Sequence, residues 1–162
     1  MKTFIKITGL GILLFAFVSC APYGGVSSST ASEIPLYSTK MIVKNGKTAQ
    51  DNYNYCLQLL SQWEWIVEKS NESTGFISAT KSTSSNIHSK VNFFIHSESI
   101  SITSEWKSSQ EATTFSSLLV GMPVSNDWQL AKWTNRNDRA SAAFGSARMF
   151  ARALGDEITY VK

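Results

Sequence analysis

The thiol and imidazole side chains are the groups in this sequence best suited to metal binding or nucleophilic chemistry. They are two cysteines, Cys20 and Cys56, and two histidines, His88 and His96. A metal site needs several such ligands at close spacings, typified by H-x-x-x-H or C-x-x-C, and neither spacing occurs here. The sequence therefore predicts no metal site, and we expect two solvated histidines, His88 in a polar loop and His96 at a strand end.

The remaining polar residues also lack the arrangements that catalysis requires. No serine lies in a G-x-S-x-G motif, and no glycine-rich phosphate-binding loop occurs in the sequence. Glu64 and Glu68 would lie about 13 Å apart along a strand, beyond the upper limit of about 9.5 Å for a glycosidase pair. We expect no catalytic residue, no cofactor and no enzyme activity, and a hydrolase with an unfamiliar site is the least favoured function.

The N-terminal segment has the three-part pattern of an export signal. Lys2 and Lys6 precede an apolar run over residues 7–18, which small Ser19 separates from Cys20. As a helix this run would cover roughly 18 Å, well short of a hydrocarbon core of about 30 Å. The pattern predicts a signal peptide over residues 1–19 rather than a membrane span.

The sequence Phe17-Val18-Ser19-Cys20 resembles a lipobox, the motif at which bacterial signal peptidase II cuts before a lipid-modified cysteine. Phe17 stands where that family usually has Leu. The resemblance implies acylation of Cys20, for example with palmitate, and, with Ala21 rather than Asp following, an anchor at the periplasmic face of the outer membrane. Ser19-Cys20-Ala21 also fits ordinary secretory cleavage after Ala21, which would release a secreted soluble protein.

Composition divides the rest of the chain into a tether and one domain. Residues 20–34 are rich in Gly, Ser and Thr and lack apolar periodicity, which predicts a flexible tether. Residues 35–162 are enough for a single domain with its own core. Without the two signal lysines, 13 basic residues face 12 acidic ones, a net charge of about +1. This near-balance indicates no strongly charged partner.

Apolar periodicity and turn residues predict the order of helices and strands in the domain. We expect strands at residues 36–43, 63–69, 76–81, 91–96, 100–106 and 158–160, helices at 48–61, 128–133 and 140–154, and a polar loop at 82–89. The state of residues 112–124 is not assigned by any pattern. This order predicts an α+β fold, in which a mostly antiparallel sheet of four to six strands carries two main helices on one face.

Both main helices have apolar stripes at three- and four-residue steps. The stripes are Tyr53, Cys56, Leu57 and Leu60 in the first helix, and Ala140, Phe144, Ala147, Ala151 and Leu154 in the second. Thr48 with Asp51 indicates an N-cap for the first helix, and Gly155 a C-cap for the second. Cys56 is therefore expected in the core, with no disulfide partner once Cys20 is lipidated.

The order of elements over about residues 36–155 resembles the small TBP-like or helix-grip domains of bacterial envelope lipoproteins. A helix precedes "W-x-W-x-V", a glycine-centred turn, "F-I-S-A-T-K" and two further alternating strands. The resemblance implies the fold and contains no diagnostic functional residue.

Aromatic and basic residues near the C-terminal helix are the candidates for binding a partner. We expect Trp63, Trp65 and Trp106 to pack in the core, and we assign partner binding to Trp128, Lys132, Trp133 and Arg136. Arg148 and Arg152 are expected on a solvated helix face. The expected function is a non-catalytic, membrane-anchored lipoprotein that binds an envelope protein or cell-wall component, with no nucleic-acid partner. The alternative is a lipoprotein that binds a small ligand or glycan, with Trp106 or Trp65 at the mouth of its site.

Overall fold

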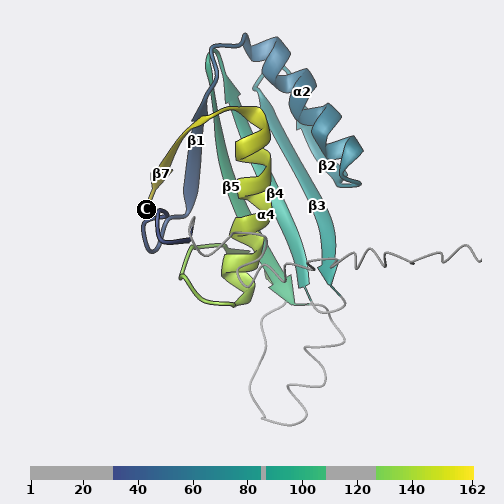
Figure 1. The fold of residues 1–162 in the computed structure, drawn as a ribbon. Helices are drawn as coiled ribbons and strands as arrows, with labels where there is room; N and C mark the ends of the chain where they lie inside the picture. The colour runs from purple at the N-terminus through teal and green to yellow at the C-terminus, as the bar shows by residue number, and fades with distance from the viewer. Residues whose placement is uncertain (1–30, 85–86, 109–126) are drawn as a thin grey trace, which may run out of the picture.

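The structure is a computed structural model that describes residues 31–84, 87–108 and 127–162 (Figure 1). Its elements are β1 (Lys40–Lys44), α2 (Ala49–Gln62), β2 (Ile66–Asn71), β3 (Phe76–Ser84), β4 (Ile87–His96), β5 (Ser99–Ser108), β6 (Gln129–Leu130), α4 (Arg139–Leu154) and β7 (Glu157–Val161). The predictions for Cys20 and for residues 112–124 fall outside this part of the chain. No helix within it is long and apolar enough to cross a membrane.

The strands form one antiparallel sheet in the order β2-β3-β4-β5-β1-β7. The short strand β6 pairs with the end of β5, at Glu105 and Trp106, beyond the stretch that pairs with β1. Both helices cover the same face of the sheet and contact each other (Figure 1). The predicted α+β fold, with a mostly antiparallel sheet and two helices on one face, is confirmed. With the short strand β6, the described residues form a sheet of seven strands, one more than the four to six expected.

The two faces of the sheet differ in polarity because strand side chains alternate in direction. The buried residues of the helix-covered face include Met41, Val43, Ile77, Ala79, Val91, Phe93, Ile95, Ile100 and Ile102. On the opposite face, the Ser78 hydroxyl donates to Oδ1 of Asn92, whose Nδ2 donates to Oε1 of Glu105, both at 2.8 Å. The apolar core therefore lies between the sheet and the helices.

Helix α2 begins and packs as its sequence pattern predicts. The Thr48 side chain accepts a hydrogen bond from the Asp51 N–H at 3.1 Å, so Thr48 is the N-cap. Tyr53, Cys56 and Leu60 are buried.

Strand β2 begins three residues later than predicted because the turn that ends α2 includes Trp63 to Trp65. The Trp63 N–H donates to the Leu59 carbonyl, and the Trp65 N–H donates to the Leu60 carbonyl. Between them Glu64 has a φ of 57°, a left-handed conformation that ends the helix. The predicted alternation of Trp63 and Trp65 on one strand face is therefore wrong.

The polar loop predicted over residues 82–89 is largely strand. Backbone pairing between β3 and β4 continues through Ser82 with His88, because ladder hydrogen bonds do not require apolar side chains. His88 thus belongs to β4 rather than to a loop, whereas His96 is the last residue of that strand, as expected.

The short helix predicted over residues 128–133 is also wrong, since this segment is extended. Gln129 and Leu130 form β6, the Ala131 N–H donates to the Ser104 carbonyl at 2.8 Å, and the Trp133 N–H donates to the Ser38 carbonyl at 2.9 Å. Ser125, Asn126 and Asp127, which precede the segment, are N-cap residue types. The long-range backbone bonds override this local signal.

Helix α4 ends before Gly155 as predicted, and the final strand forms as β7. Gly155 has an extended backbone with φ 177°, so glycine is not required here for a left-handed conformation. A Cβ at this position would lie 2.9 Å from the carbonyl oxygen of Lys44. Glycine is therefore needed here for the close approach of the chain to β1.

The domain starts earlier than the predicted boundary at residue 35. Ala31 and Ile34 are both 3% exposed and belong to the hydrophobic core. These residues, assigned to the tether from composition, are part of the folded domain.

Candidate functional site

One end of the sheet brings an indole and a guanidinium together beside the start of α4. Trp106 lies on β5, in register with the other side chains that face the helices. Arg139 is the first residue of α4 and its guanidinium carbon lies 5.9 Å from the centre of the Trp106 ring. The same guanidinium donates to the hydroxyl of Ser108, also on β5. This bond fixes Arg139 near the indole.

Asp138 is the N-cap of α4. Its carboxylate accepts hydrogen bonds from the Ser141 N–H at 2.7 Å and from the Thr134 hydroxyl at 2.5 Å. Partial burial alone would raise the pKa of Asp138, but the hydrogen bonds from Thr134 and Ser141 and the nearby positive charge of Arg136 together lower it. The carboxylate is thus ionised and occupied by its structural partners.

We expect Asp138→Ala to lower the free energy of unfolding by about 1 kcal/mol near neutral pH, because an N-cap is lost. The folded-state pKa is lowered, so the stabilisation is complete above the unfolded value of about 3.9 and is lost as the pH falls through the folded value. Urea unfolding at neutral and acidic pH measures this difference. Asp138→Asn, which keeps a capping oxygen, should stay near wild type at neutral pH. Equal stability of the Ala variant there would contradict the cap.

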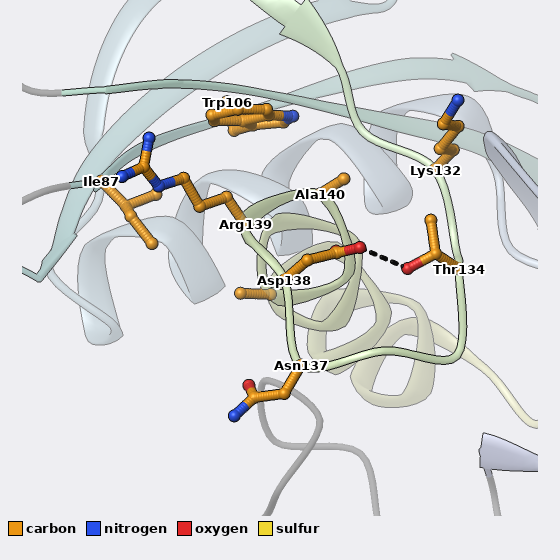
Figure 2. A pocket seen from close by; sticks show the side chains of 9 residues that line it. Ile87, Trp106, Lys132, Thr134, Asn137, Asp138, Arg139 and Ala140 are labelled. Atoms are coloured by element: carbon orange, nitrogen blue, oxygen red, sulfur yellow. Dashed lines mark hydrogen bonds between the residues drawn. The ribbon is translucent and has the colours of Figure 1, made fainter. Parts of the chain in front are cut away.

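These groups surround a cavity of about 570 Å³, here named the Trp106 cavity. Its lining residues are Ile87, Trp106, Lys132, Thr134, Asn137, Asp138, Arg139, Ala140 and Ala142. Figure 2 shows Trp106 and Arg139 on one side of it, with Lys132 and Thr134 on the other. A concave site of this volume with an aromatic face and a few polar groups suits a small organic group of a ligand or partner.

Two of the four predicted partner-binding residues lie at or near this cavity. Lys132 lines it, and exposed Arg136 lies in the connection between Thr134 and Asp138. Trp133 is a correction, because its side chain is fully buried and its ring centre lies 6.0 Å from that of Phe144. A residue in the core cannot contact a partner.

Trp128, the fourth predicted residue, lies on the opposite face of the sheet. Its ring centre is 4.2 Å from Nζ of Lys90 and 4.7 Å from Nζ of Lys107, which places it among the outward side chains of β4 and β5. The four residues therefore do not form one surface.

Other candidate reactive groups are not assembled into a site. Burial raises the pKa of the Cys56 thiol to about 12, so it is protonated and inert, as expected of a core cysteine. Within the described ranges, no three His, Cys, Asp or Glu side chains are grouped closely enough to hold a metal ion.

Thr134, Asn137 and Asp138 also line the cavity, and none of them is among the site residues predicted from the sequence. The sequence does contain one signal, because Asp138 precedes Ser141 by three residues, as an N-cap does. That signal places the helix start. It does not reveal that β5 lies beside it.

A scan of protein-family models, a search of curated proteins and a search of solved structures each found no match to this chain.

Proposed function

We propose that this protein is a non-catalytic lipoprotein of the cell envelope, anchored through Cys20, whose domain binds another envelope component in the Trp106 cavity. The observation that carries the binding role is the open cavity of about 570 Å³ that joins Trp106 to charged and polar side chains. The anchor rests on the signal-like N-terminal sequence.

The cavity offers two kinds of contact. The face of Trp106 provides a large apolar surface, on which a ring or aliphatic group can stack. Arg139 and Lys132 provide positive charge, and Asn137 and Thr134 provide hydrogen-bonding groups. Since tryptophan and arginine dominate binding energy at many interfaces, Trp106 and Arg139 are the expected anchors.

Trp106→Ala should reduce recovery of the bound component about 30-fold, since loss of an anchoring tryptophan removes at least about 2 kcal/mol of binding energy. The measurement is quantitative crosslinking in intact envelopes, followed by purification of the protein and comparison of each crosslinked species. Arg139→Gln should reduce the same species.

Trp128→Ala is the matched control, because it removes a tryptophan from the opposite face of the sheet. Circular dichroism of each variant establishes that the fold is intact. If the same species is recovered equally from folded Trp106→Ala and wild type, the cavity is not the binding site.

The same cavity supports a glycan as the bound group, because tryptophan stacking beside amide, hydroxyl and charged groups is also how proteins hold sugars. Soluble cell-wall glycan fragments then compete with the crosslinked species in wild type. An envelope protein as the partner leaves crosslinking insensitive to these fragments.

A further inference from the structure

Arg148, in the middle of α4, is a buried arginine, only 8% exposed. This corrects the expectation of a solvated helix face at this position. Its Nε–H donates to the hydroxyl oxygen of Tyr160, on β7, at 2.8 Å. Among the described residues, the ion pairs found involve lysines and not Arg148 or Arg152. A charge that is largely removed from water and makes no ion pair costs folding free energy, and arginine cannot lose its proton to avoid this.

The guanidinium of Arg148 has spare hydrogen-bonding capacity. Arginine carries five N–H donors, and the bond to Tyr160 uses the one on Nε. The four others form the planar fork that matches the two oxygens of a carboxylate. The remaining N–H groups of Arg148 are therefore suited to bind an anionic group.

Arg148 lines a cavity of about 300 Å³, here named the Arg148 cavity. The other lining residues are Glu33, Arg152, Gly155, Asp156, Ile158 and Tyr160. This volume is at the lower end for ligand pockets, which indicates a small ligand. The lining has two guanidinium groups and two carboxylates, so its formal charges cancel.

We propose that the Arg148 cavity binds a small zwitterion with a carboxylate next to an ammonium, as in an amino acid. The carboxylate meets Arg148, and the ammonium meets the exposed carboxylates of Glu33 and Asp156. A simple anion is attracted by the arginines and repelled by these carboxylates, and both effects grow with its charge, so further negative charge brings no net gain. A zwitterion gains from both signs of charge.

This inference is independent of the proposed function. The Arg148 cavity and the Trp106 cavity share no lining residue. Failure at one leaves the other unaffected, and the variants that test them are different.

Three probes of matched size test the charges separately: alanine, propionate, which lacks the ammonium, and ethylammonium, which lacks the carboxylate. Titrations of the full-length protein in detergent are followed by the NMR signal of the Arg148 Nε–H, assigned by its loss in Arg148→Met. Alanine should bind at least tenfold more tightly than ethylammonium. It should bind about threefold more tightly than propionate, because the ammonium contacts are at an exposed rim.

Arg148→Met should reduce alanine affinity at least tenfold while raising Tm by about 3 °C, since an apolar side chain replaces a buried charge without a carboxylate partner. Lys69→Met is the control, because Lys69 is an exposed basic residue that does not line this cavity. Tyr160→Phe removes only the hydroxyl that holds Arg148, and it should weaken alanine binding without unfolding the domain.

Two results would overturn the proposal. Equal binding of propionate and alanine excludes the zwitterion, and no shift of the Arg148 signal with any probe excludes the site. The wild-type titrations decide both points, even if a variant fails to fold.

Discussion

Cys20→Ala should abolish fatty-acid labelling of the protein and release the domain from the membrane fraction. The proposed anchor is a covalent modification of the Cys20 thiol, so no other residue is expected to replace it. Multiple acyl chains hold a protein durably at a membrane, so their loss should remove the proposed attachment. Metabolic labelling with palmitate and fractionation of membranes measure the two effects.

Cys56→Ala is the matched control for this experiment. Cys56 lies in the core on α2, and burial raises the pKa of its thiol to about 12, so it does not accept a lipid in the folded protein. Labelling of this variant should equal that of wild type. Persistent labelling of Cys20→Ala would refute the anchor, and a mature chain that begins at Pro22 would establish secretory cleavage instead.

Local sequence patterns predicted the elements whose side chains alternate or repeat over many residues. The hairpin of β4 and β5 followed from the alternation of Val91, Phe93 and Ile95 with polar neighbours. The apolar stripe and Thr48 cap located α2 within about one residue. In both cases one face of the element is buried, so the spacing of the apolar residues indicates whether the element is a helix or a strand.

Non-local pairing accounts for the main errors. Residues 128–133 have a helix-like start signal, yet backbone bonds to Ser104 and Ser38 hold them extended. These partners lie far away in the sequence. No local pattern indicates them. For the same reason Trp133 was predicted to lie on the surface, although it is buried in the core.

Both cavities depend on contacts of this non-local kind. Trp106 meets Arg139 because β5 ends beside the start of α4, and Arg148 meets Tyr160 because β7 returns alongside that helix. The sequence does show that all four arginines gather near the C-terminal helix. It does not show that Arg139 and Arg148 line different cavities.

Phe150→Ala should lower the free energy of unfolding by about 3–5 kcal/mol, a large share of the 5–15 kcal/mol typical of a domain. Phe150 is fully buried on α4. Three other aromatic rings surround it, and the distances between ring centres are 4.6 Å to Trp63, 5.4 Å to Trp65 and 5.3 Å to Phe93. Trp63 is the C-cap of α2, Trp65 immediately precedes β2, and Phe93 lies in β4. One truncation therefore weakens the packing of both helices on the sheet. Alanine's higher helix propensity returns only about 0.5 kcal/mol.

Met149→Ala separates this packing effect from any general effect on α4. Met149 is the adjacent helix residue and is 51% exposed, so its loss should change stability by less than about 0.5 kcal/mol. Thermal unfolding should show a fall in Tm of about 10 °C or more for Phe150→Ala and almost none for Met149→Ala. Equal shifts in the two variants would mean that the aromatic cluster does not join the helices to the sheet, and that the domain is stabilised chiefly by contacts within its sheet.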